Sequence, residues 1–172
     1  MNAVTQNFRP LIAAGTLLGI GMGGFVDGIV LHQILQVHNM LSAKLPPNTL
    51  ANVEINMVWD GIFHAFTWLM TAIGLSMLWK AGQKREVPWS TKTFLGSLLQ
   101  GWGIFNLVEG IIDHHLLNLH HVVERLGVSI ADWLFLAIGG VLFIVLGRAL
   151  INAGRGGDGP DTHPSPAFSG RA

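Results

Sequence analysis

The sequence contains no cysteine among its 172 residues. This absence excludes disulfides, thiolate zinc or copper sites, iron–sulfur clusters and covalently attached haem. Charge is also scarce, because only 12% of the residues are Asp, Glu, Lys or Arg, and they balance to a formal net charge of zero. Half of the residues are hydrophobic, which is too high a share for a soluble domain of this length. The composition therefore indicates a membrane protein.

Four long apolar segments fill most of the chain. Each reaches the roughly 20 residues with which a helix crosses a hydrocarbon core about 30 Å thick. Strands are excluded, because the segments lack the alternation of a barrel strand and lipid does not tolerate an open strand edge. We therefore expect an all-α polytopic membrane protein with a four-helix transmembrane domain over residues 11–151. The expected helices cover residues 11–35, 53–79, 94–117 and 130–151.

The distribution of Lys and Arg predicts the orientation of these helices. Eight of the ten basic residues lie on the side that holds both termini and the middle loop, and only Lys44 and Arg125 lie on the other side. By the positive-inside rule, both termini are expected in the cytoplasm, with residues 1–10 as a short N-terminal segment. Residues 152–172 are rich in Gly, Pro and Ser and predict a disordered tail.

Two stretches of the chain, residues 19–40 and 101–122, align without a gap at an offset of 82 residues. They share eight identities in 22 positions, and acidic and imidazole side chains keep their places. The aligned pairs are Asp27 with Glu109, His32 with His114, and His38 with His120. At an offset of 72, Asp60 also aligns with Asp132, whereas His64 falls on Leu136. We expect two parallel copies of a two-helix unit.

Acidic and imidazole side chains gather on the outer side of the expected bundle. A charged carboxylate near the bilayer centre costs about 2.5 to 3.5 kcal/mol on insertion scales, so this clustering needs a reason. Carboxylate and imidazole groups supplied from several helices are ligands of Zn, Fe, Mn and Cu(II) sites, and we expect such a metal site here. Its expected ligands are Asp27, His32, Asp60, His64, Glu109 and His114, followed by His38, Asp113 and His120.

Helical geometry leaves one question about this site open. His32 lies about 140° from Asp27 around an ideal α-helix, and the aligned pair has the same spacing. A straight helix therefore does not direct both side chains at one atom. The glycine after each acid permits a local bend, or the histidine is a ligand reached from another face, or it belongs to a second site. His38, eleven residues after Asp27, is expected about 20° from it after three turns.

The cofactor and the use of the site are also open. Zinc or copper is favoured, iron is a further option, and a haem held between two histidines such as His32 and His114 is an alternative. The site would serve a metalloenzyme or a metal-handling protein on the outer side, and enzymatic activity is not decided. A structural polar network, or proton handling or transport without metal, is the remaining alternative, although the inner halves of the helices offer few polar residues for a transport path.

Three strings carry a resemblance to a known family: GFVDGIVLHQILQ, VWDGIFHAFTW and NLVEGIIDHHLLNLHHV. They resemble a bacterial family of predicted four-helix membrane proteins, Domain of Unknown Function 2243, over about residues 10–150. The resemblance implies a protein of the bacterial inner membrane with no assigned activity, and it brings no catalytic residue. The lipid bilayer is the expected surrounding. A periplasmic metal donor or acceptor and a homo-oligomer stay open as partners, and no nucleic acid is expected.

Overall fold

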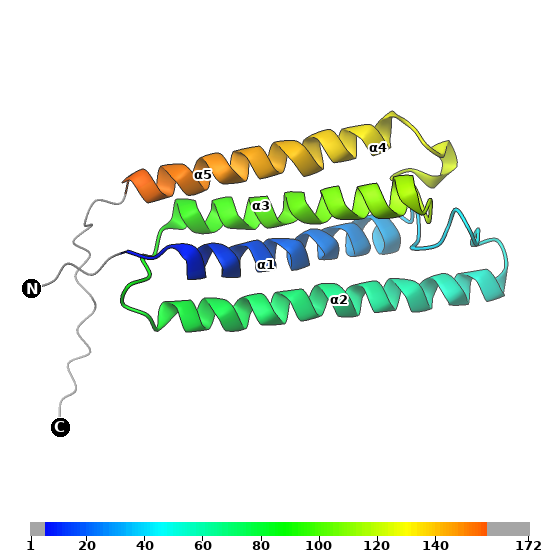
Figure 1. Ribbon diagram of the computed structural model, residues 1–172. Coiled ribbons are helices and arrows are strands. Elements are labelled where there is room, and N and C mark those ends of the chain that lie inside the picture. Colours follow the sequence, from blue (N-terminus) through cyan, green and yellow to red (C-terminus); the bar gives the residue numbers. More distant parts are fainter. Residues whose placement is uncertain (1–5, 158–172) are drawn as a thin grey trace, which may run out of the picture.

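In the computed structural model, which describes residues 6–157, the chain forms a bundle of four membrane-length helices (Figure 1). Each helix is long and apolar enough to cross a membrane, and the described residues contain no strand. The spans are Arg9–Ile34, Leu50–Gly82, Thr91–Leu116 and Ile130–Gly156. Both ends of the described chain lie at the same end of the bundle (Figure 1). The prediction of an all-α, four-helix membrane protein is confirmed.

Three of the four spans change from α-helix to π-helix, a wider turn with hydrogen bonds between residues five apart. The first span consists of α1 (Arg9–Val26) and η1 (Asp27–Ile34), and the third of α3 (Thr91–Glu109) and η2 (Gly110–Leu116). The fourth consists of α4 (Ile130–Leu134), η4 (Phe135–Leu142) and α5 (Phe143–Gly157), whereas the second is α2 (Leu50–Gly82) alone. η1, η2 and η4 are the π-helices, and η3 (Glu124–Leu126) is a short 3-10 turn. The first and third spans thus widen at the aligned acids.

The helix boundaries differ from those expected, most clearly at the C-terminal end. The predicted disordered tail begins too early, because α5 continues to Gly157. A Cβ added to Gly154 would overlap the side chains of Ser90 and Thr93 at the start of α3. The small residues here therefore serve close helix packing, although their composition resembles that of a disordered segment. The rest of the predicted tail, 158–172, lies outside the described residues, as do residues 1–5.

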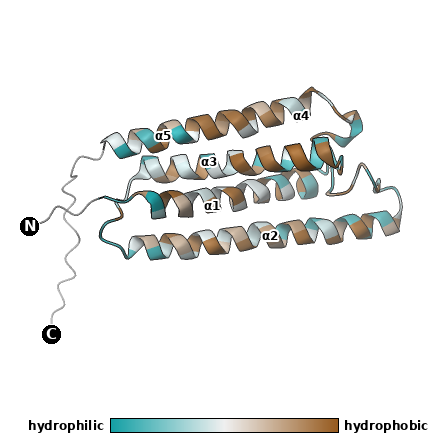
Figure 2. Cartoon of the chain, viewed as in Figure 1, coloured by the Kyte–Doolittle hydropathy of each residue, from teal (hydrophilic) through white to brown (hydrophobic). Residues whose placement is uncertain are grey.

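α1 and α3 form the centre of the bundle. Half of the most apolar window of the first span is buried and 44% of that of the third, against 17% in each of the other two. Glycines allow the two backbones to touch, since a Cβ on Gly19 would overlap the carbonyl of Leu98, and one on Gly101 that of Thr16. The exposed faces of α2 and α5 carry large hydrophobic side chains, among them Trp68, Leu75 and Val145, and brown segments alternate with paler and teal ones along both helices (Figure 2). These faces therefore suit contact with lipid.

Two loops close the end of the bundle opposite the termini (Figure 1), residues 35–49 and 117–129. Near its start, each loop has a residue in the left-handed region, Gln36 with φ 49° and Asn118 with φ 48°. These two residues are 82 apart. The hydrogen bonds around them also match at this offset: Leu35 and Leu117 donate to Val30 and Ile112, and Val37 and Leu119 donate to Leu31 and Asp113. The left-handed residue turns each loop back over the bundle.

Candidate metal centre

Four buried histidines lie together beneath the two loops: His32, His38, His114 and His120, here called the histidine cluster. Each is at most 3% exposed. Ring centroids of neighbouring imidazoles are 4.6 to 6.4 Å apart. Two buried carboxylates, Asp27 and Glu109, face the cluster. These six residues form the candidate centre, and all six were expected as ligands from the sequence.

The π-helix η1 brings Asp27 and His32 together. The two residues are five apart, which is about one turn of a π-helix, so both side chains lie on the same face. The His32 Nε2 atom lies 3.2 Å from Asp27 Oδ2. On its other side, the His32 Nδ1 atom lies 2.9 Å from Oδ1 of Asp60 in α2. The change of helix type answers the question that the ideal α-helix left open.

The second half has the same arrangement. Glu109 ends α3, and His114 follows it by five residues in η2. The His114 Nε2 atom lies 2.9 Å from Glu109 Oε1, and its Nδ1 atom lies 3.3 Å from Oδ1 of Asp132 in α4. His32 and His114 each lie between an acid of their own span and an acid of the following span.

His38 and His120 enter the centre from the loops, and the expectation that they continue the helical face is wrong. His38 Nδ1 donates a hydrogen bond to the carbonyl of Val122, and His120 Nδ1 donates one to the carbonyl of Met40, both at 3.1 Å. A carbonyl only accepts, so the proton sits on Nδ1 and each Nε2 atom is left to face the carboxylates. The Nε2 atom of His120 lies 2.9 Å from Glu109 Oε1, and that of His38 lies 3.9 Å from Asp27 Oδ1.

The pKa values of the two loop histidines shift in opposite directions, although burial acts to lower both. Burial lowers the pKa of His38 to about 3, and the neighbouring charges of His120 and His32 act in the same direction. Burial also opposes a charge on His120, but the hydrogen bond to the Glu109 carboxylate outweighs it and the pKa of His120 is raised. His38 is therefore neutral at neutral pH, which is the form that binds a metal ion.

Buried polar atoms without a hydrogen-bond partner gather at the candidate centre. Among the described residues there are ten such side-chain atoms, and six of them belong to the centre. They are Asp27 Oδ2, His32 Nε2, His38 Nε2, Glu109 Oε2, and both ring nitrogens of His114. Leaving a buried polar group unpaired costs about 1 to 3 kcal/mol, so a concentration of this kind calls for a ligand.

Asp60 and Asp132 support the cluster from outside. Asp60 accepts hydrogen bonds from the Asn39 side chain and the Met40 backbone N–H, both at 2.9 Å. Asp132 accepts from the backbone N–H groups of Val122 at 3.0 Å and Ser129 at 2.8 Å. These bonds fix the carboxylates that contact His32 and His114. Asp132 was not among the expected ligands, although its alignment with Asp60 was the signal for it.

His64 is not brought into the cluster. Its Nδ1 atom donates to the backbone carbonyl of Asp60 at 2.7 Å, one turn earlier in α2. Its ring packs so close to Gly28 that an added Cβ would lie 2.7 Å from Nε2. Leu136, the residue that aligns with His64, packs on Gly110 in the same way. Residues 64 and 136 therefore both pack against the glycine that follows an aligned acid, and a leucine fills this place as well as a histidine does.

Asp113 also lies apart from the cluster. It follows Glu109 by four residues, whereas the π-helix places the fifth residue, His114, on the face of the centre. The Asp113 side chain makes no hydrogen bond within the described part of the chain, and it lines an apolar pocket beside the centre. Seven of the nine expected residues thus come together, and Asp60 is the one that lies behind His32. His64 and Asp113 lie apart.

Comparison with known proteins identifies a matching family. The model of a family described as a predicted membrane protein (DUF2243) matches residues 14–154. This range contains the candidate centre and both loops that cover it. No curated protein and no solved structure matches the chain.

Proposed function

The chain belongs to the DUF2243 family of predicted membrane proteins, and from the geometry of the candidate centre we propose that it is a metal-binding protein of the bacterial inner membrane. The candidate centre would hold a transition-metal ion in the outer half of the bundle. The contacts that match at an offset of 82 residues support the expectation that two copies of one two-helix unit supply the ligands in equivalent pairs.

One contact supports metal binding most directly. The Nε2 atom of His120 and Oε1 of Glu109 are 2.9 Å apart. Because His120 donates from Nδ1 to the Met40 carbonyl, a neutral ring presents only a lone pair to the carboxylate. Two acceptors at this distance repel each other. In the metal-free protein a second proton on His120, which its raised pKa favours, relieves this repulsion, and a metal cation would replace that proton. A cation at this position would also serve His114, whose Nε2 atom is 2.9 Å from the same oxygen.

The fixed Nδ1 atoms favour a metal ion over a proton. A histidine that binds a metal usually donates its other N–H to a carboxylate or a backbone carbonyl, which sets the orientation of the ring. All four rings of the histidine cluster have Nδ1 beside such a group. A purely structural network has no need to leave four Nε2 atoms directed at two carboxylates.

The donor atoms form two overlapping groups. His32, His38 and His120 form one, and Glu109, His114 and His120 form the other, with ligand atoms within 4.8 Å of one another in each. The second group is the two-histidine, one-carboxylate set that zinc enzymes and non-haem iron enzymes use. Zinc, copper(II) and iron all suit these donors. A haem suits them less, because the contacting imidazoles leave no room for a macrocycle between them.

The burial of the ligands favours a resident cofactor. An ion passed on to a periplasmic partner needs an open ligand, whereas the four histidines are 1 to 3% exposed and covered by loops. A resident ion in the outer half of a bundle suits a metalloenzyme or an electron-transfer protein. A transport path is less well supported, since the buried acids and imidazoles of the described chain gather at one end of the bundle.

Metal analysis of the purified protein tests this proposal. We expect stoichiometric metal in wild-type protein by plasma mass spectrometry, and its loss in His120→Ala, which removes the ligand that both groups share. His64→Ala is the matched control, because it removes an imidazole from the same bundle but outside the cluster, and it should keep its metal. Near-ultraviolet circular dichroism shows whether each variant is folded. Metal-free wild-type protein from metal-supplemented cells, or folded His120→Ala with full metal content, would contradict the proposal.

A further inference from the structure

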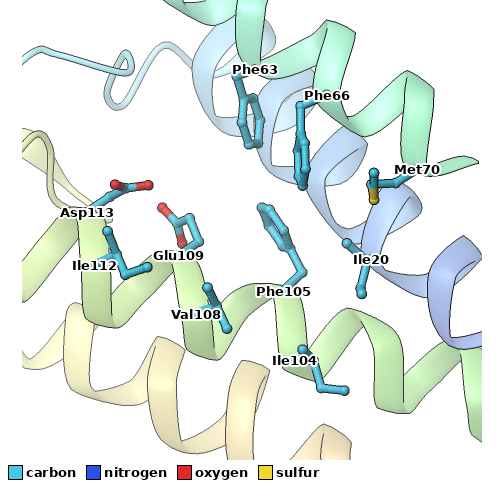
Figure 3. Close-up of a pocket in the computed structure, with 10 residues that line it drawn as sticks. All are labelled: Ile20, Phe63, Phe66, Met70, Ile104, Phe105, Val108, Glu109, Ile112 and Asp113. Atoms are coloured by element: carbon cyan, nitrogen blue, oxygen red, sulfur yellow. The ribbon is translucent and has the colours of Figure 1, made fainter.

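An apolar pocket lies beside the candidate centre, between the middle sections of the helices (Figure 3). Its volume is about 370 Å³, within the range of sites that hold small organic ligands. Phe63, Phe66 and Met70 of α2 form one wall, and Phe105 and Val108 of α3 form the opposite wall. Two carboxylates, Glu109 and Asp113, lie at one end, and they are the only acidic or basic side chains that line the pocket.

The open side of this pocket faces lipid. Phe66 and Val108 lie in the middle of membrane spans and are 47% and 51% exposed. A side chain exposed at this depth contacts hydrocarbon and not water. A molecule that enters the pocket therefore comes from the bilayer, and its body must be apolar.

The carboxylates at one end of the pocket determine which polar group such a ligand can carry. Glu109 is 6% exposed, and its Oε2 atom is buried without a hydrogen-bond partner, while Oε1 faces His114 and His120. The Asp113 side chain has no hydrogen-bond partner within the described chain either, and carboxylate oxygens only accept when ionised. A ligand that brings a hydrogen-bond donor therefore suits the Asp113 carboxylate. An anionic lipid headgroup would be repelled by two acids, and a cationic headgroup would pay a large cost to lie at this depth.

We propose that this pocket binds a membrane-soluble hydroxyl compound, an apolar molecule with a phenol or alcohol head whose hydroxyl donates to Asp113. Because Asp113 lines the pocket beside Glu109, which belongs to the candidate centre, the hydroxyl would lie near the bound ion. This second statement rests on the proposed function, whereas the binding itself does not require the metal. The ligand would thus approach the candidate centre laterally, from the bilayer.

A matched pair of probes tests the proposal on the full chain in detergent or nanodiscs. 4-Dodecylphenol carries a donor, and 4-dodecylanisole has the same apolar body with the donor blocked. We expect one phenol per chain in native mass spectrometry, bound about tenfold more tightly than the anisole, as one hydrogen bond to a charged acceptor predicts. Asp113→Leu should weaken this preference severalfold or remove it.

Two tryptophan variants check the location. Val108→Trp fills the pocket and should abolish binding of both probes, whereas Val145→Trp, on an exposed position of α5 that does not line the pocket, should leave it unchanged. Equal affinity for the two probes would show that any alkyl chain fills the pocket, and it would overturn the proposal. Unchanged binding in Val108→Trp would overturn it as well.

Metal content measured on the same samples keeps this proposal separate from the metal proposal. Asp113→Leu and Val108→Trp should both retain the wild-type metal content, since neither residue belongs to the candidate centre. A phenol preference in protein without metal would leave the pocket assigned and the metal proposal refuted. Stoichiometric metal without a phenol preference would support the metal proposal and refute the proposed ligand of the pocket.

Discussion

Each imidazole of the histidine cluster has its Nδ1 atom beside a fixed hydrogen-bond acceptor. His32 and His114 have Nδ1 beside the carboxylates of Asp60 and Asp132, and the two loop histidines donate from Nδ1 to backbone carbonyls. The rings of His32, His38 and His120 therefore cannot rotate to other partners without losing a hydrogen bond at Nδ1. The side chains are thus already arranged for a ligand at their Nε2 atoms, which lowers the entropic cost of binding it.

Removing the charge of a supporting acid should weaken metal binding without removing a ligand. In Asp60→Asn the side chain keeps its size but no longer presents a carboxylate to His32 Nδ1. We expect metal affinity to fall about 10- to 100-fold, the effect typical of such outer partners. Competition with a chromophoric chelator measures this change. Glu54→Gln, an exposed acid on the same helix, is the control, and equal affinities in the two variants would contradict the assigned role of Asp60.

Protonation of His38 should destabilise the metal-free protein in acid. Its pKa is about 3 in the folded protein against 6.5 in an unfolded chain. Between these values the unfolded state binds more protons, so the free energy of unfolding falls as the pH falls from 6.5 towards 3. The raised pKa of His120 adds no slope in this window, because that residue is protonated in both states.

Thermal unfolding of chelator-treated protein in detergent measures the effect of His38. We expect the unfolding temperature to fall through this pH window, and to fall less steeply in His38→Gln, where the titrating group is absent. Parallel pH profiles for the two proteins would show that His38 does not contribute.

At the scale of the elements, the wide turns of η1 and η2 and the close contact of α1 with α3 place the acids. In each π-helix, the histidine five residues after the acid lies on the same face as that acid. The glycine contacts bring α1 and α3 close together, and with them the two acids at the ends of these helices. π-helices are uncommon and frequently occur at functional sites, where they redirect a side chain. The π-helices at both aligned acids therefore have the same role in the two halves, which is to place the histidine beside the acid.

A methyl group between α1 and α3 should disturb this contact. In Gly19→Ala the added Cβ would overlap the carbonyl of Leu98, and the two helices would have to separate. We expect a loss of about 1 to 3 kcal/mol in the free energy of unfolding, as in other overpacked cores. Gly61→Ala is the matched control, because a Cβ there meets nothing within 4 Å, and it should be neutral or stabilise the helix by up to about 1 kcal/mol. A similar loss in both variants would contradict the packing role of Gly19.

At the scale of the whole molecule, the candidate centre lies at the end of the bundle opposite the termini, beneath loops 35–49 and 117–129. The loops contact each other through backbone bonds from Ala43 to Leu119 at 3.0 Å and from Glu124 to Val37 at 3.2 Å. Each half therefore covers the centre of the other. The centre depends on both halves and on the connection between them.

The side of the membrane on which this end lies can be measured directly, because the chain has no cysteine to interfere. With both termini in the cytoplasm, Lys44→Cys in the first loop should react with a membrane-impermeant maleimide in cells whose outer membrane is permeabilised. Lys84→Cys, at the opposite end, should react only after the inner membrane is opened. Both positions are exposed, so burial does not account for a difference. The reverse pattern would place the candidate centre on the cytoplasmic side.

Several properties of this protein follow from residue order alone. Hydropathy and segment length are local quantities, and they predict the four spans and the all-helical membrane fold, which is confirmed. The spacing of Asp27, His32 and His38 and its recurrence 82 residues later also identify most of the candidate centre. A buried acid in an apolar helix is costly, so its position is informative even without a structure.

The remaining features depend on contacts between segments far apart in the chain. Periodicity of 3.6 residues could not place His32 beside Asp27, because it sets the two side chains about 140° apart and the π-helix η1 departs from that period. It could not return His38 to the bundle either, since the left-handed residue Gln36 carries no sequence signature. The same holds for His64, which has the residue type of a ligand and the place of a packing residue. Tertiary contacts settle these points because the energy of a buried polar group depends on which partners reach it.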